Sequence, residues 1–166
     1  MTNHWRDIKN ADVILINGAN PAEAHPVGFQ WFMKAKLDPT KGPGKGGGAR
    51  MIHADPRFSR TSAVCDQYVR IRTGTDVAYF GGLINYVLQN NKFHDEYVKN
   101  YTNAAFIVSK DYKFHDGLFS GYDKKKRSYQ IDSWAYETGA DGFAKRDETL
   151  KDPRSVFQLL KAHYSR

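Results

Sequence analysis

The chain has 166 residues, of which 40% are hydrophobic and 14% aromatic, enough for the core of one domain or of one domain with a tail. It contains no run of about 18 apolar residues, which argues against a transmembrane helix, and its first residues lack the basic-then-apolar layout of a secretory signal. The net charge of +7 favours anionic partners such as nucleic acids, phosphates or acidic proteins, although a lysine-rich solvated surface accounts for it equally well. The single cysteine, Cys65, excludes an internal disulfide framework and a cysteine-ligated metal cluster, and we expect it to be a small buried residue.

The first part of the chain alternates between patterns typical of strands and of helices. Residues 5–11 suit a short helix, and the apolar run at 13–16 predicts a strand buried on both faces, as in a parallel sheet. Helical spacing follows over 21–36. The stretch 37–48, rich in glycine and proline, is expected to be a flexible surface insertion; it lacks the Gly-Lys-Ser/Thr ending of a phosphate-binding P-loop.

Two more strands and two more helices are predicted before residue 102. The strands are expected at 50–54 and 67–72, a helix capped by Thr75 at 76–90, and a short helix at 94–101. The longer helix has an apolar face formed by Val77, Phe80, Leu83, Ile84, Val87 and Leu88. This order of elements predicts an α/β fold with a doubly wound, mostly parallel, Rossmann-like sheet that binds ligands at the carboxyl ends of its strands.

The last third of the chain has no sustained periodicity. Residues 102–150 predict irregular structure, in which the basic run 124–127 is interpreted as a solvated turn rather than a nucleic-acid-binding patch. A last helix is expected to start at Asp152-Pro153. We therefore expect an α/β domain over 1–100 and an irregular extension ending in a helix over 101–166.

Three clusters that could carry chemistry each follow a predicted strand, and the first begins at Asn17. Gly18 lets the backbone turn sharply and approach a phosphate. Asn20 can donate or accept, and a helix beginning near Pro21 is expected to aim free backbone N–H groups at an anion. An ordinary strand-to-helix turn remains the alternative.

The second cluster is the segment 55–61, Asp55-Pro56-Arg57-Phe58-Ser59-Arg60-Thr61. A carboxylate at the end of the second strand can accept both hydroxyl protons of a ribose. Arg57 and Arg60 could pair with a diphosphate. The alternative is an Asp-Pro turn with exposed arginines.

The third cluster is Gly74-Thr75-Asp76. The carboxylate of Asp76 could accept the N1 and N2 protons of guanine, a pair of donors that adenine does not offer. It could instead only stabilise the start of the helix. The six histidines show no metal-ligand spacing, and no catalytic or metal-binding residue is assigned in this chain.

Taken together, these clusters resemble the catalytic subunits of the molybdopterin oxidoreductase family, and within it the respiratory-type formate dehydrogenases that use molybdenum or tungsten. The segments that carry the resemblance are 1–5, 17–26, 55–61, 71–76, 101–104, 116–123 and 142–147. The resemblance implies that the chain corresponds to the first of two α/β domains that each bind one molybdopterin guanine dinucleotide.

The same resemblance implies three sets of cofactor-binding residues. Those around the diphosphate and ribose would be Asn17, Gly18, Ala19, Asn20, Glu23 and Ala24. Those in contact with the nucleoside would be Asp55, Pro56 and Arg57. Those at the guanine end would be Gly74, Thr75 and Asp76.

The resemblance also implies what this chain lacks. Members of the family oxidise formate to carbon dioxide with a metal-bound selenocysteine or cysteine followed by histidine, upstream of the motif that stands here at residues 2–5. Cys65 is followed by Asp66 and does not match that pair. The isolated chain is therefore expected to be inactive, and the iron–sulfur cluster of the parent subunit is not expected in it. A selenocysteine codon interpreted as a stop would explain a start at Met1, and this hypothesis predicts an in-frame UGA a short distance upstream.

The expected partners are the rest of the catalytic subunit and an iron–sulfur electron-transfer subunit, with no nucleic acid and no direct membrane insertion. Self-association of the chain through exposed apolar surface is a further expectation. The resemblance implies a periplasmic location, with the cytoplasm as the alternative. A free-standing nucleotide-binding or assembly module is the second hypothesis. A small nucleotide-dependent dehydrogenase is disfavoured, because the Gly-x-Gly-x-x-Gly fingerprint is absent after the first strand.

Overall fold

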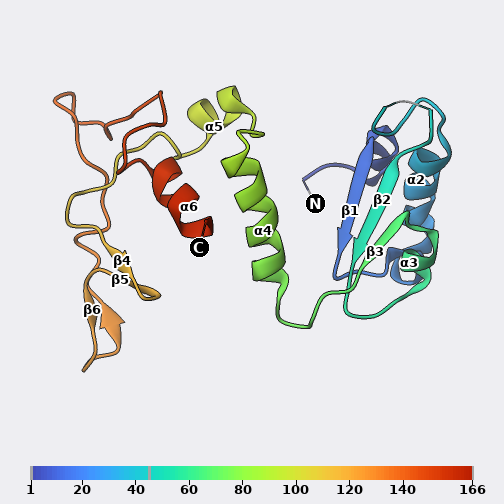
Figure 1. The fold of residues 1–166 in the computed structure, drawn as a ribbon, viewed down its shortest axis with the longest axis horizontal. Helices are drawn as coiled ribbons and strands as arrows, with labels where there is room; N and C mark the ends of the chain where they lie inside the picture. Colours follow the sequence, from blue (N-terminus) through green and yellow to red (C-terminus); the bar gives the residue numbers. More distant parts are fainter. Residues whose placement is uncertain (1, 45, 166) are drawn as a thin grey trace. The chain divides into compact units, whose positions relative to one another are not determined.

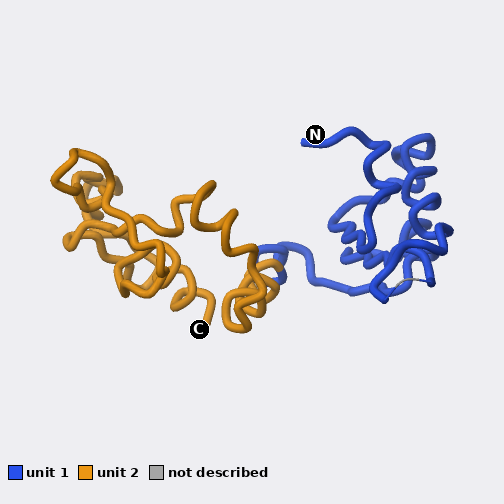
Figure 2. Tube along the Cα trace, turned by 90° about the horizontal axis from the view of Figure 1, so that it is seen from above, with its two compact units in different colours: residues 1–79 blue, residues 80–166 orange. Residues whose placement is uncertain are grey.

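A computed structural model of the protein describes residues 2–44 and 46–165. Lys45, which belongs to the predicted glycine-rich insertion, and the terminal Met1 and Arg166 lie outside the described residues. The chain forms two compact units, residues 1–79 (unit 1) and 80–166 (unit 2), shown in Figure 2. The boundary predicted between residues 100 and 101 is of another kind, because it divides a cofactor-binding part from an irregular extension. That boundary stays a prediction.

Unit 1 contains a parallel sheet with the strand order β1-β2-β3 (Figure 1). The strands are β1 (Val13–Asn17), β2 (Arg50–Ala54) and β3 (Gln67–Val69). All three were predicted, but β3 ends at Val69 instead of residue 72. The neighbouring strand β2 ends at Ala54, which is paired with Val69 and followed by Asp55-Pro56. Residues 70–72 therefore have no strand residue of β2 opposite them.

The helices of unit 1 are η1 (Trp5–Asn10, a 3-10 helix), α1 (Pro21–Ala24), α2 (Pro26–Leu37) and α3 (Arg60–Val64). The single helix predicted over 21–36 is thus interrupted at His25, whose φ of −140° and ψ of 58° are not helical. Pro26 is the cause, because a proline excludes the residue before it from the helical region. The short helix α3 was not predicted in this segment, which is rich in serine and threonine.

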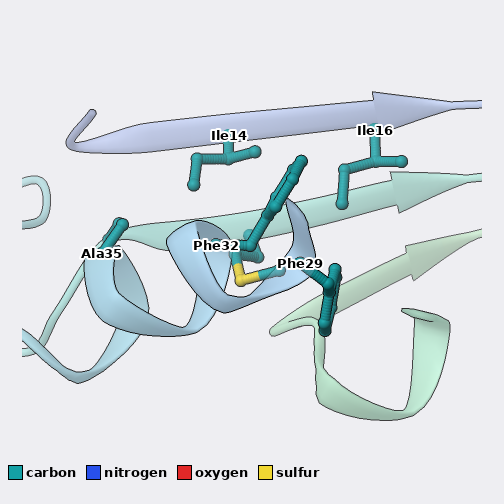
Figure 3. Close-up of a cluster of buried hydrophobic side chains, with 7 residues drawn as sticks. Ile14, Ile16, Phe29, Phe32 and Ala35 are labelled. Atoms are coloured by element: carbon teal, nitrogen blue, oxygen red, sulfur yellow. The ribbon is translucent and has the colours of Figure 1, made fainter. Parts of the chain in front are cut away.

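The core of unit 1 lies between the sheet and α2, as Figure 3 shows. Its buried residues are Ile14, Ile16, Phe29, Phe32, Ala35, Ala49 and Met51. Ile14 and Ile16 point into this core, whereas Val13 and Leu15 on the other face of β1 are 52% and 40% exposed. The prediction of burial on both faces of β1 is therefore wrong for this structure, because its side chains alternate between a covered and an open face. A mixed α/β fold with a parallel sheet is confirmed.

The elements assigned to the second part of the chain begin with α4 (Asp76–Gln89), which runs across the division, and α5 (Asp95–Tyr101). The hairpins β4 (Phe114–His115) with β5 (Leu118–Phe119) and β6 (Tyr122–Asp123) with β7 (Ser128–Tyr129) follow, and then α6 (Val156–Tyr164). The basic run 124–127 is a turn between β6 and β7, as predicted. Helix α6 starts at Val156, four residues after the predicted start, because the hydroxyl of Ser155 accepts the Gln158 N–H and caps the helix there.

The core of unit 2 is small, and consists of Ala104, Ala105, Leu150 and Phe157. Beside it, a turn forms around Asp147, whose carboxylate accepts the N–H groups of Thr149, Lys151 and Asp152. Among the helices of residues 2–44 and 46–165, none combines the length and the apolarity needed to span a bilayer.

Candidate functional site

The predicted cluster after β1 begins with a turn that is tied to the neighbouring strand. Gly18 has a φ of +60°, and its N–H donates to the carbonyl of Ala54 at the end of β2, at 3.0 Å. A Cβ built at Gly18 would meet no atom within 4 Å. Glycine is therefore required here by its left-handed backbone conformation, not by a close neighbour.

Asn20 is held by a threonine of α3. The hydroxyl of Thr61 accepts the Ala22 N–H at 3.1 Å and donates to the Asn20 Oδ1 at 2.8 Å. Thr61 is completely buried, so these are the contacts that compensate for removing its hydroxyl from water.

The start of α1 does not offer the free backbone donors that the sequence predicted. Pro21 has no N–H, the Ala22 N–H donates to Thr61, and those of Glu23 and Ala24 donate to the carbonyl of Asn20. Helix α1 is a single turn, so its amides are used within the chain. Within the described residues, the remaining donors of this segment are the backbone N–H groups of Ala19 and Asn20 and the Asn20 Nδ2, none of which has a hydrogen-bond partner.

His53, on β2, is completely buried beneath the same segment. Its Nε2 lies 2.9 Å from the carbonyl oxygen of Ala19, and its Nδ1 lies 2.7 Å from the hydroxyl of Ser62. A carbonyl oxygen can only accept, so Nε2 carries the proton in this contact. In the neutral ring, Nδ1 then accepts from the Ser62 hydroxyl.

Asp55, at the end of β2, forms the Asp-Pro turn that was one of the two alternatives, and its contact with a ribose stays a prediction. Its Oδ1 accepts the Arg57 N–H at 2.8 Å, which makes it part of an Asp-Pro turn. Its Oδ2 lies 3.9 Å from the His53 Nε2, too far for a hydrogen bond, and is left to accept from a ligand. The predicted arginine Arg57 is exposed, whereas the Nε of Arg60 lies 3.5 Å from the carboxylate of Glu23.

The first and third clusters meet directly. The Asn17 Nδ2 donates to the Asp76 Oδ1 at 2.9 Å, across 59 residues of sequence. The Asn17 Oδ1 is buried and has no hydrogen-bond partner within the described residues. The hydroxyl of Thr75 donates to the carbonyl of Arg72, and the Thr75 carbonyl accepts the Tyr79 N–H of α4, so capping by the Thr75 hydroxyl stays a prediction. Since the Gly18 contact also joins the first cluster to β2, all three predicted clusters lie at one end of the sheet.

The described residues provide neither a reactive cysteine nor a cluster of metal ligands. Burial raises the pKa of the Cys65 thiol to about 11, so this side chain is a protonated thiol at neutral pH and a poor nucleophile. Within residues 2–44 and 46–165, no three histidine, cysteine, aspartate or glutamate side chains gather so that they could hold a metal ion. What the arrangement offers is a set of hydrogen-bond donors next to carboxylate acceptors, which suits a phosphate-containing ligand with hydroxyl or amino groups.

Comparison with known proteins places this arrangement in a family. Residues 1–129, which include all three clusters, match the family described as molybdopterin oxidoreductase. The chain belongs to the molybdopterin oxidoreductase family. It is 55% identical over all 166 residues to the formate dehydrogenase-O major subunit of Escherichia coli K12, and 52% identical over the same length to the formate dehydrogenase 2 subunit alpha (cytochrome c-553) of Nitratidesulfovibrio vulgaris.

A more distant relative matches a shorter part of the chain. The F420-dependent formate dehydrogenase subunit alpha of Methanocaldococcus jannaschii is 38% identical over 104 residues, 63% of this chain and 14% of that protein. The chain spans 16% of the length of the Escherichia coli and Nitratidesulfovibrio relatives. The family resemblance predicted from the motifs is therefore confirmed, and the role of each cluster residue stays a prediction.

Sequence reasoning gave no role to three residues that hold the clusters: His53, Ser62, and Thr61, which stands at the end of the second cluster. The alternation of side chains along β2 could have placed His53 on the same buried face as Met51, because the two are two residues apart in a strand. Nothing in the sequence around Thr61 and Ser62 indicates that they contact the loop after β1.

Proposed function

We propose that the chain binds the guanine dinucleotide arm of a molybdopterin cofactor, within the catalytic subunit of a formate dehydrogenase. The observation that carries the proposal is the Asn17–Asp76 hydrogen bond, because it joins two clusters that were each predicted to contact a nucleotide. The unpartnered donors of Ala19 and Asn20 and the buried, unpartnered Asn17 Oδ1 fit a ligand that both accepts and donates hydrogen bonds.

Each cluster has a role in this proposal. The phosphate and ribose region would lie against Asn17, Gly18, Ala19, Asn20, Glu23 and Ala24. The nucleoside would lie against Asp55, Pro56 and Arg57, with the free Asp55 Oδ2 as the acceptor for ribose hydroxyls. The guanine would lie against Gly74, Thr75 and Asp76, since a carboxylate that accepts one bond from Asn17 can still accept two from a base.

The chemistry of the bound cofactor would be the two-electron oxidation of formate at molybdenum or tungsten. The residues of this chain would contribute binding and orientation of the nucleotide. We further propose that the working enzyme includes the rest of the catalytic subunit and an iron–sulfur subunit, that it acts in the periplasm, and that the open face of β1 is covered there by a second layer of a doubly wound fold.

The proposal is tested by measuring the affinity of the 166-residue chain for GDP, ADP and NAD by isothermal titration calorimetry. We expect GDP to bind more tightly than ADP. The substitution Asp76→Asn should weaken GDP binding about tenfold and leave ADP binding unchanged, because the amide keeps an acceptor for Asn17 but loses the bidentate contact to guanine.

Asp111→Asn is the matched control, an exposed carboxylate far from the three clusters in the sequence. Preference for ADP or NAD over GDP would contradict the proposal and favour a small nucleotide-dependent dehydrogenase. Formate oxidation by the isolated chain would contradict the assignment of a binding role without catalytic residues.

A further inference from the structure

The loop after β1 rests on three buried polar side chains to which the sequence prediction gave no role. His53 and Thr61 are completely buried, and Ser62 is 3% exposed. They come from β2 and α3, and His53 and Thr61 bond directly to the segment Ala19–Ala22. Burying such groups is costly unless their hydrogen bonds are made, so these bonds fix the geometry of the loop.

The proton of the Thr61 hydroxyl determines how the Asn20 amide is turned. The oxygen of this hydroxyl accepts the Ala22 N–H, so its single proton is available for the Asn20 Oδ1. The carbonyl end of the Asn20 amide is thereby held by Thr61. Its other end, the Nδ2 with two N–H groups, has no partner within the described residues.

His53 orients the backbone of the same loop, as Thr61 orients the Asn20 side chain. It holds the carbonyl oxygen of Ala19 at 2.9 Å. The peptide bond between Ala19 and Asn20 is trans, so the N–H of Asn20 points away from that carbonyl and hence away from His53. The Ser62 hydroxyl, which lies 2.7 Å from the other ring nitrogen and accepts the Ser59 N–H, fixes the orientation of the ring.

We propose that Thr61 and His53 are positioning residues that turn the side-chain and backbone donors of Asn20 toward the diphosphate of the bound nucleotide. The identity of the ligand rests on the function proposed above. The two residues do not touch the ligand in this proposal; they act through Asn20 and Ala19.

The test compares GDP with guanosine, which lacks phosphate, on the 166-residue chain by isothermal titration calorimetry. Thr61→Val removes the hydroxyl at nearly constant shape, and we expect it to weaken GDP binding about tenfold while leaving guanosine binding unchanged. Thr61→Ser keeps the hydroxyl and should restore GDP binding to within about twofold of the original chain. Thr102→Val is the control, because the Thr102 hydroxyl, in unit 2, likewise donates one hydrogen bond, to the Val98 carbonyl, and accepts one, from the Ala104 N–H.

A second measurement does not depend on a ligand. Hydrogen exchange of the Ala22 amide should become faster in Thr61→Val and return to its original rate in Thr61→Ser, because that amide donates to the Thr61 hydroxyl. If Thr61→Val does not fold, Asn20→Asp serves instead: it keeps the acceptor for Thr61 but replaces the free donor with a negative oxygen. We expect Asn20→Asp to abolish the preference for GDP over guanosine.

The outcomes separate this inference from the proposed function. If Thr61→Val weakened GDP and guanosine binding by the same factor, the role of Thr61 would be purely structural and the inference would be overturned. If Thr61→Val bound GDP as tightly as the original chain, the inference would also be overturned. An original chain that binds neither compound would overturn the proposed function together with the role of Asn20 toward phosphate. Unchanged Ala22 exchange in Thr61→Val would overturn the hydrogen-bonded arrangement itself.

Discussion

The two units of the chain are stabilised in different ways. Unit 1 pairs strands that are distant in sequence and buries hydrophobic side chains from both its sheet and α2. The pairing in unit 2 consists of two-residue hairpins and isolated bridges such as Phe106 with Arg146, around a smaller buried cluster. The candidate site lies entirely on the regular unit. The difference teaches that the part of the chain with continuous parallel strand ladders, rather than isolated bridges, is also the part that holds several distant clusters in fixed positions.

The largest expected effect is the loss of Phe157, which is 5% exposed and packs its ring 5.0 Å from that of Phe93 in the small core of unit 2. Phe157→Ala should lower the free energy of unfolding of this unit by about 3–5 kcal/mol. Urea unfolding followed by Trp134 fluorescence in a Trp5→Phe, Trp31→Phe background measures it, since Trp134 belongs to unit 2. Phe157→Leu is the control and should cost less. A change below about 1 kcal/mol would mean that unit 2 does not depend on this core.

Met51 is the matching residue of unit 1, and it is completely buried between β2 and α2. Met51→Ala should cost about 2–5 kcal/mol, and the volume-conserving Met51→Leu less than about 1.5 kcal/mol. Fluorescence of Trp5 and Trp31 in a Trp134→Phe background reports on unit 1. If the transition seen by Trp134 in the Trp5→Phe, Trp31→Phe background shifted equally, the two units would unfold together and the comparison would fail.

Gly18 gives a smaller effect that separates backbone strain from packing. Its φ of +60° and the empty space around a built Cβ predict a cost of about 1–2 kcal/mol for Gly18→Ala, all of it conformational. Gly18→Asn should cost less, because asparagine enters the left-handed region more easily. Equal destabilisation by both substitutions in urea unfolding would indicate a steric cause instead.

The smallest effect concerns acid stability in unit 2. A hydrogen bond from the Thr149 hydroxyl, followed by backbone N–H groups including that of Asp152, lowers the pKa of Asp147 from 3.8 to about 2. A carboxyl whose pKa is lowered by folding adds stability above its unfolded pKa, and this contribution is lost as the pH falls through its folded pKa. The difference in melting temperature between the original chain and Asp147→Asn, on the order of 5 °C, should therefore be constant above about pH 4 and shrink toward pH 2. Thermal unfolding by circular dichroism from pH 2 to pH 6 measures it, and a difference independent of pH would contradict this role.

Strand β1 could be predicted because it is a short apolar run closed by polar or turn-forming residues, Asp12 before it and Gly18 after it. Its burial could not be judged in the same way. Val13 and Leu15 are as apolar as Ile14 and Ile16, and only the position of α2 decides which pair is covered. The break at His25 was predictable from Pro26 and was missed, because the helical spacing on either side of it is continuous in sequence.

The candidate site was predicted in its outline but not in its support. Turn glycines and carboxylates at strand ends are visible in the sequence, because parallel strands end at one edge of a sheet. The roles of His53 and Thr61 depend on which groups they meet across the fold, and neither residue type nor spacing encodes that. The interpretation of α1 as a source of free amides failed for the same reason, since the partner of the Ala22 N–H lies 39 residues away.

The contact between Asn17 and Asp76 has a consequence for the order of events during synthesis. The two residues stand near opposite ends of unit 1, so this contact cannot form until the chain beyond Asp76 has left the ribosome. The turn after β1 needs only β1, β2 and α3, which emerge earlier. In the proposed function, a nascent chain would therefore acquire the groups proposed to contact phosphate before those proposed to contact the base, and the nucleotide would be inserted into the completed unit.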